Sequence, residues 1–132
     1  MASRRVFTAP RMARMGNPVV HFEVGCRDKD RSAKFFSDCF GWEAGPYHDL
    51  AKSLTPGGDS IDGHVTALGH EPHNYVLFYI EVEDIAAALE KVTAEGGAAH
   101  IGPLEIPGDG RSFAWFKDPD GNMLGLITPK AD

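Results

Sequence analysis

The sequence has little cysteine and no long hydrophobic run. Cys26 and Cys39 are its only cysteines, and no C-x-x-C pair is present, which excludes a disulfide framework and a cysteine zinc site. No apolar run approaches the ~20 residues that cross a bilayer, and none forms the apolar core of a secretory signal. We therefore expect a cytoplasmic protein that is not embedded in a membrane, with both cysteines reduced and packed.

Several motifs of nucleotide-binding and nucleophilic enzymes are also missing. The chain holds no Gly-x-Ser-x-Gly, no phosphate-binding loop and no dinucleotide fingerprint. Its paired glycines, at 57–58 and 108–110, have the spacing of hairpin turns instead. Neither nucleotide chemistry nor a serine or cysteine nucleophile is expected.

Positive charge is scarce outside the first residues. Residues 1–14 contain four arginines and no acid, so the remainder carries 9 basic and 19 acidic groups, a charge of −10 within a total of −6. An acidic body repels phosphate backbones, and we expect no nucleic-acid partner. Residues 1–16 are interpreted as a flexible basic extension, with a nucleic-acid arm or a transit peptide as alternatives.

The remaining sequence has the same order of elements twice. In the first half, a β-rich run at 19–26 predicts a strand, and Asp28 or Asp30 caps a helix over 31–40 that ends at Gly41. Short strands are then predicted at 43–47, 52–55 and 64–68. In the second half, a strand at 75–82 precedes a helix that Asp84 caps and the pair Gly96-Gly97 ends. Three more strands are predicted at 99–105, 112–117 and 122–127.

The two helices define an internal repeat. Asp28 and Asp84 are 56 residues apart, and so are Gly41 and Gly97. A repeat of about half the chain predicts two modules that share one core, because a module of this size is marginal alone. The predicted fold is α+β: two tandem βαβββ modules that form an incomplete barrel around one cleft. The boundaries are 1–16 for the extension, 17–68 for the first module, 69–74 for a linker and 75–129 for the second module.

Three stretches carry a resemblance to a known family. They are residues 20–24 leading into 30–36 and 40–42, residues 80–85 through 96–97, and residues 116–127 with the turn Asp-Pro-Asp-Gly. In this order they resemble the vicinal oxygen chelate superfamily, which contains glyoxalase I, bleomycin-resistance proteins and extradiol dioxygenases. The resemblance spans about residues 17–129 and implies the same fold, and it suggests a homodimer. It leaves the activity open, because this superfamily hosts several.

The resemblance also implies where a metal would be held. His21 matches the first ligand position of metal-dependent members, and the residue 56 positions later is Leu77, at the third. The fourth position falls on Gly125, and Asp62 and His64 are the candidates for the second. With two positions lost, we expect no cofactor. A divalent metal stays as an alternative, with His21 as a ligand only in an unorthodox site.

Six residues are the candidates for the cleft. His21 and Glu23 lie two apart on a strand and share a face, so they are the candidate catalytic acid and base. The candidate ligand-binding residues are His64, Tyr75, Tyr79 and Trp115. The alternative for His21 and Glu23 is a histidine hydrogen-bonded inside the barrel with the glutamate at its rim. For the others it is ordinary strand aromatics at Tyr75 and Tyr79, core packing at Trp115 and a solvated position near a turn at His64.

Three functions remain open at this stage. The first is a small-molecule-binding protein of the bleomycin-resistance kind, of undetermined activity and without the usual metal site. The second is a lyase, isomerase or dioxygenase of the glyoxalase superfamily that uses His21 and Glu23. The third is an interaction module whose cleft is filled by its own side chains.

Overall fold

The computed structural model describes residues 16–68 and 73–130. Residues 1–15 of the predicted extension and residues 69–72 of the predicted linker lie outside the described residues. The module boundaries therefore stay a prediction.

The elements follow the predicted order, βαβββ twice, which confirms the α+β fold. The first set is β1 (Val19–Gly25), α1 (Lys29–Phe40), β2 (Glu43–His48), β3 (Ala51–Thr55) and β4 (Asp62–Thr66). The second set is β5 (Val76–Glu81), α2 (Ile85–Ala94), β6 (Ala98–Glu105), β7 (Ser112–Lys117) and β8 (Met123–Ile127). The largest differences from the predicted bounds are of two residues: α1 begins at Lys29 instead of 31, and β4 begins and ends two residues earlier than the predicted 64–68.

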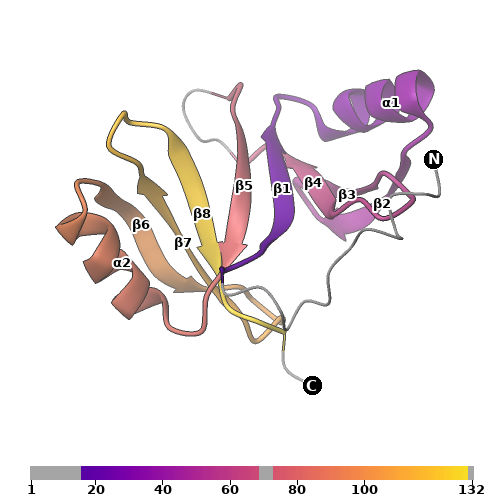
Figure 1. The fold of residues 1–132 in the computed structure, drawn as a ribbon. Helices are drawn as coiled ribbons and strands as arrows, with labels where there is room; N and C mark the ends of the chain where they lie inside the picture. Colours follow the sequence, from indigo (N-terminus) through magenta and orange to yellow (C-terminus); the bar gives the residue numbers. More distant parts are fainter. Residues whose placement is uncertain (1–15, 69–72, 131–132) are drawn as a thin grey trace.

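All eight strands form one open sheet in the order β2-β3-β4-β1-β5-β8-β7-β6. The first strands of the two sets, β1 and β5, pair antiparallel at its centre (Figure 1). Each of them also pairs in parallel with the last strand of its own set, β1 with β4 and β5 with β8. The sheet is therefore two matching halves joined by their first strands, with β2 and β6 as its edges.

Both helices begin at an aspartate cap. Asp28 rather than Asp30 caps α1, because its carboxylate accepts hydrogen bonds from the backbone N–H groups of Asp30 and Arg31. Asp84 caps α2 in the same way through the N–H of Ala87. Gly41 ends α1 with a φ of 72°, which is in the left-handed region that favours glycine.

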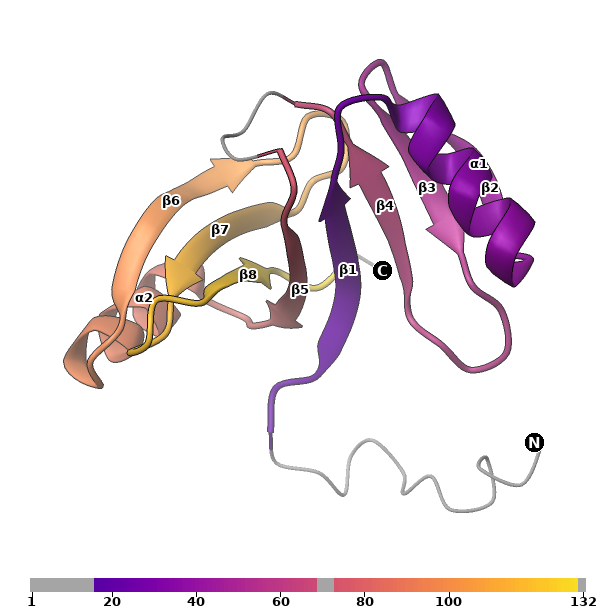
Figure 2. The same cartoon turned by 90° about the horizontal axis from the view of Figure 1, so that it is seen from above.

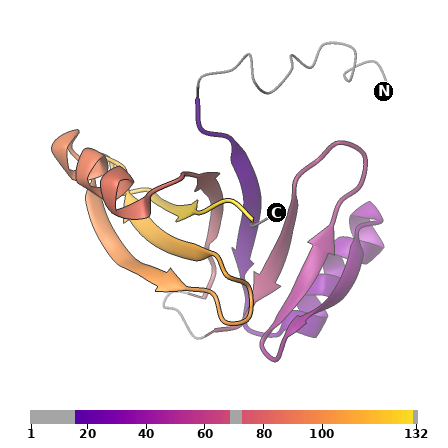
Figure 3. The same ribbon diagram turned by 90° about the horizontal axis from the view of Figure 1, so that it is seen from below.

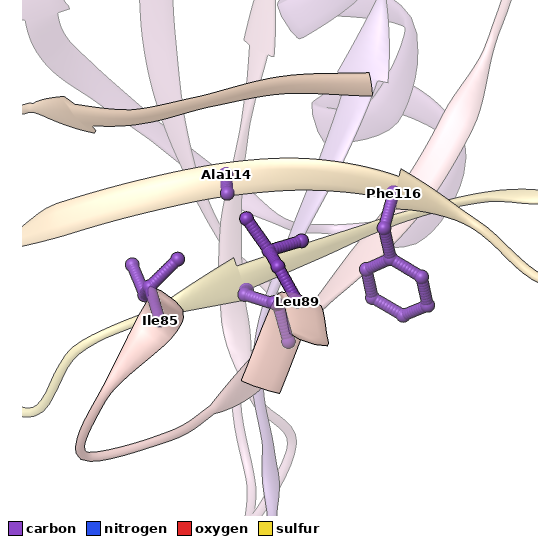
Figure 4. Packing of buried hydrophobic residues seen from close by; sticks show 5 residues of the cluster. Ile85, Leu89, Ala114 and Phe116 are labelled. Atoms are coloured by element: carbon purple, nitrogen blue, oxygen red, sulfur yellow. The ribbon is translucent and has the colours of Figure 1, made fainter. Parts of the chain in front are cut away.

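The helices cover the outer face of the sheet and leave its inner face open (Figures 2 and 3). Helix α2 packs its Ile85 and Leu89 on Ala114 and Phe116 of β7 (Figure 4). Helix α1 lies over Phe22 of β1 and the hydrophobic cluster around it. Because side chains alternate along a strand, the neighbouring residues of β1 and β7 point to the other face.

One packing prediction is wrong. Both cysteines are free, and Cys26 is half-buried, but Cys39 is exposed on α1. It lies about 120° around the helix from the buried Ala33 and therefore off the stripe that faces the sheet.

The helices are too short to cross a membrane. The longer one, α1, has 12 residues and α2 has 10. Within residues 16–68 and 73–130, no helix is long and apolar enough to span a bilayer.

Candidate functional site

A pocket of about 620 Å³ lies on the inner face of the sheet, opposite the helices. Phe113 and Trp115 of β7 and Ile127 of β8 line it, in alternation with the residues that pack under α2. Tyr47 of β2 and the turn between β6 and β7, with Asp109, contribute further parts of the wall. A cavity of this size, mostly apolar with a few convergent polar groups, is typical of small-molecule sites.

The polar groups of the pocket come from the central strands. His21 and Glu23 lie on β1, His64 on β4 and Tyr79 on β5. The strand register brings them together, because Glu23 pairs with His64 across one side of β1 and His21 pairs with Tyr79 across the other. The Nε2 atom of His21 lies 2.7 Å from Nδ1 of His64, and Nε2 of His64 lies 3.4 Å from Oε1 of Glu23.

Glu23 is a buried carboxylate with both oxygens in use. The Tyr79 hydroxyl donates to its Oε1 over 2.6 Å, and the Tyr75 hydroxyl donates to its Oε2. The indole N–H of Trp115 then donates to the Tyr79 oxygen over 2.8 Å. Only 4% of Glu23 is exposed, so its charge is held by these groups and by His64 rather than by water.

The pKa values of Glu23, Tyr75 and Tyr79 are shifted by this arrangement. Burial raises the pKa of Glu23, but the contact with His64 and the hydrogen bonds from both tyrosines outweigh it, so the pKa lies below its ordinary 4.5. Burial and the adjacent carboxylate raise the pKa of the Tyr75 and Tyr79 hydroxyls. At neutral pH, Glu23 is thus ionised and both tyrosines keep their protons.

The histidine pair has one proton arrangement when both imidazoles are neutral. A carboxylate only accepts hydrogen bonds, so the proton of His64 is assigned to Nε2, which faces Glu23. Nδ1 of His64 then accepts from the Nε2–H of His21. This leaves Nδ1 of His21 unprotonated, and within the described residues it makes no hydrogen bond.

His21 is expected to make the protein sensitive to acid. Burial, and then the neighbouring His64, lower its pKa from 6.5 to about 4. Between these values the unfolded chain takes up a proton that the folded chain does not, so stability falls as the pH falls. At about pH 4.5 this costs about 2.5 kcal/mol relative to neutral pH.

Urea denaturation of the wild type and of His21→Asn at about pH 7.5 and about pH 4.5 checks this expectation. The wild type should lose more stability on acidification, by about 2.5 kcal/mol. Replacing His100, exposed on β6 outside the pocket, by asparagine is the matched control. An equal acid loss in His21→Asn and the wild type contradicts the expectation.

The register favours one of the two candidates for the second metal-ligand position that the resemblance implies. Tyr79 lies 56 residues after Glu23, and it pairs with Gly125 as Glu23 pairs with His64. His64 is therefore the repeat mate of Gly125, the residue at the implied fourth position, while Asp62 is exposed. The first half of the sheet thus keeps two histidines at these positions.

The second half of the sheet does not fit the family's metal. Leu77 is a buried member of the hydrophobic cluster under the pocket and offers no ligand atom. Gly125 has no side chain, and a Cβ there would overlap the ring of Tyr79. Tyr79 therefore fills the space of the fourth ligand. Within the part of the chain that the structure describes, no three His, Cys, Asp or Glu side chains are grouped to hold a metal ion.

Most of the predicted site residues lie together. His21, Glu23, His64, Tyr79 and Trp115 all line the pocket. Tyr75 is not among the residues that line it; it donates its hydroxyl to Glu23 and contacts Trp115 edge-on, with ring centroids 5.5 Å apart. The catalytic and ligand-binding roles of these residues stay proposals.

Tyr47 and the turn that carries Asp109 are among the parts of the wall that sequence reasoning missed. Tyr47 stacks on His64 with ring centroids 4.7 Å apart. Asp109 lines the pocket and forms an ion pair with Arg111. Tyr47 lies in a predicted strand, but nothing in the sequence showed which face of the sheet that strand presents to the pocket. The turn at 106–111 carries only ordinary hairpin signals.

Comparisons with known proteins agree with the fold. The chain is 31% identical over 114 residues to a glyoxylase-like domain-containing protein of Didymella fabae, covering 80% of this chain and 89% of that one. It is 27% identical over 125 residues to a probable lactoylglutathione lyase of Vibrio cholerae, covering 85% and 91%. A methylmalonyl-CoA epimerase structure from Mycobacterium tuberculosis superposes with a TM-score of 0.69 at 11% identity, covering 95% of both chains.

The family model of the Glyoxalase/Bleomycin resistance protein/Dioxygenase superfamily matches residues 19–126, nearly the whole of the described chain. This agrees with the eight-stranded sheet of two matching halves and with the inner-face pocket between them. The chain belongs to the Glyoxalase/Bleomycin resistance protein/Dioxygenase superfamily.

Proposed function

We propose that the protein binds a small organic molecule in the inner-face pocket without the family's metal. The observation that carries the proposal is the pocket of about 620 Å³, with aromatic walls and the imidazoles of His21 and His64 at its polar end. A cleft filled by its own side chains, the third possibility from the sequence, would leave no such volume. The metal is left out of the proposal because Leu77 and Gly125 take two of the four ligand positions.

Tryptophan fluorescence tests this proposal directly. The chain has two tryptophans. Trp115 lines the pocket, whereas Trp42 stacks on Phe36 beside α1. In the Trp42→Phe variant, Trp115 alone reports on the pocket. We expect saturable changes in its emission from members of a library of small organic molecules, in the presence of a chelator.

The same titrations in Trp42→Phe/His64→Ala provide the matched control, because His64 lies in the pocket wall and its loss should weaken the response. Metal dependence is tested by adding zinc, nickel, manganese or iron(II) after chelation. A metal at 100 times its dissociation constant would raise the melting temperature by roughly 10 °C. No saturable shift of that size is expected. A library without any saturable binder, or binding only after metal is added, overturns the proposal.

A lyase or isomerase that transfers a proton is the second candidate. It is favoured by the chain of contacts from Glu23 through His64 to His21. In such an enzyme, Nδ1 of His21 accepts the proton, and Glu23 holds the orientation of His64. Relatives named lactoylglutathione lyase support this class.

The basicity of His21 decides between the two candidates. A general base works best with a pKa near the working pH. The pKa of His21, about 4, makes it a poor proton acceptor at neutral pH. We therefore place binding first. Turnover of a bound compound by the wild type, lost in His21→Asn while binding persists, would reverse this order.

We also propose that the chain forms a homodimer. The support is an apolar patch on the outer face of β5, where Val76 is 74% and Phe78 39% exposed between the two helices. Light scattering should give twice the chain mass of 14.3 kDa. The mass of a single chain at high concentration would contradict this.

A cytoplasmic location is likewise proposed from the sequence.

A further inference from the structure

The ionised groups at the pocket are already paired. Glu23 receives both tyrosine hydroxyls and faces His64. Asp109 is held by Arg111 in a two-bond ion pair, with Nε to Oδ1 at 2.6 Å and Nη2 to Oδ2 at 2.9 Å. Within the described residues, no lysine or arginine lines the pocket. A charged ligand group of either sign would therefore be buried without a free counter-charge, which is costly.

The walls of the pocket fit a flat apolar molecule. Phe113 and Trp115 line the pocket from β7. Tyr47 lines it from β2, where its ring stacks on that of His64. Aromatic side chains pack well against a planar ring through stacked or edge-on contacts. The volume of about 620 Å³ is large enough for a molecule with two or more fused rings.

The polar end of the pocket has a defined hydrogen-bond direction. With one proton on each imidazole, the carboxylate of Glu23 places the proton of His64 on Nε2, and the proton of His21 then lies on its own Nε2. Nδ1 of His21 is then a lone-pair acceptor. A ligand atom that meets it must carry a hydrogen, because two acceptors repel each other.

We propose that the pocket selects an uncharged aromatic molecule with a hydroxyl or N–H group that donates a hydrogen bond to Nδ1 of His21. This inference rests on the proposed function and names the ligand class for the same pocket. A pocket of this kind should bind phenol-like and indole-like compounds more tightly than carboxylates, ammonium compounds and ethers of the same size.

Four matched probes test the inference by calorimetric titration at about pH 8, where free imidazoles are neutral. They are 2-naphthol, 2-methoxynaphthalene, 2-naphthoate and 2-naphthylmethylammonium, which share one ring system and differ in the polar group. We expect 2-naphthol to bind at least tenfold more tightly than each of the others. The wild-type comparison needs no variant that might fail to fold.

Two variants then locate the contact. His21→Leu should weaken 2-naphthol to the affinity of 2-methoxynaphthalene and leave the ether unchanged. Arg111→Gln should leave 2-naphthol binding more tightly than the ether and the naphthoate. It removes the partner of Asp109 at the pocket wall, so only the ammonium compound should gain affinity. Tightest binding by naphthoate that Arg111→Gln abolishes would instead make Arg111 an anion site and overturn the inference.

Other outcomes separate the inference from the proposed function. Equal binding of the naphthol and the ether, or tightest binding by the ammonium compound, overturns the inference and leaves small-molecule binding standing. The same holds if library compounds bind but none of the four probes does. If neither the probes nor any library compound binds, the proposed function itself fails.

Discussion

Glu23→Ala is expected to lower the free energy of unfolding by about 3–5 kcal/mol, because it removes one side of a buried charged network. The carboxylate is 4% exposed and receives the hydroxyls of Tyr75 and Tyr79. Its loss removes the acceptor of both hydroxyls and of the Nε2 of His64. A buried polar group without a partner costs about 1–3 kcal/mol, so the buried Tyr79 hydroxyl and the buried imidazole of His64 account for the expected size.

Urea denaturation at neutral pH measures this loss, with Glu43→Ala as the matched control. Glu43 is also a strand glutamate, on β2, but it is exposed. Its replacement should change stability by no more than about 0.5 kcal/mol. Glu23→Gln should fall between the two, since the amide keeps one accepting oxygen. If Glu23→Ala costs no more than Glu43→Ala, the network does not stabilise the fold.

The loss at Glu23 also has a defined pH dependence. The pKa of Glu23 in the folded chain lies below its ordinary 4.5. Its ionised form therefore contributes stability above that ordinary value, and the contribution disappears as the pH falls through the folded pKa. The difference between the wild type and Glu23→Ala should accordingly shrink in acid.

Local chemistry explains why much of the fold is predictable from the sequence. Asp28, Asp84 and Gly41 act within one turn of their own helices, and the 56-residue spacing of the two aspartate caps reveals the repeat without any knowledge of tertiary structure. The shared face of His21 and Glu23 follows from strand alternation alone. These features need only neighbouring residues, so they are visible in the sequence.

The contacts that define the site depend on distant pairings. Asp62 and His64 share one face of β4, so which of them lies beside Glu23 depends on the register of β1 with β4, across about 40 residues of chain. The bond between Tyr75 and Glu23 joins residues 52 apart, and the stacking of Tyr47 on His64 depends on how far the sheet curves. No local pattern carries this information. The sequence supplied the candidates, and the sheet register selected among them.

Leu89→Ala is the second large effect, expected to cost about 2–5 kcal/mol through lost burial and the cavity left behind. Leu89 is 9% exposed and packs with Ala114, Phe116 and Leu126 of the sheet. Leu89 and Ile85 are the buried residues by which helix α2 contacts the sheet, with the partly buried Ala88 and Val92 packed beside them (Figure 4). A cavity here is therefore filled only if the helix moves. Denaturation should show the loss as a lower midpoint with an unchanged slope.

The exposed neighbour Glu90 is the matched control, and Glu90→Ala should cost well under ~1 kcal/mol. Similar small effects at both positions would show that the assigned helix face is wrong. The repeat alignment that makes Leu77 the equivalent of His21 would then be wrong as well.

A second measurement uses the fact that β7 carries Phe116 under the helix and Trp115 in the pocket. Because small domains unfold as a unit, the folded fraction of Leu89→Ala should keep the wild-type emission of Trp115 below its melting transition.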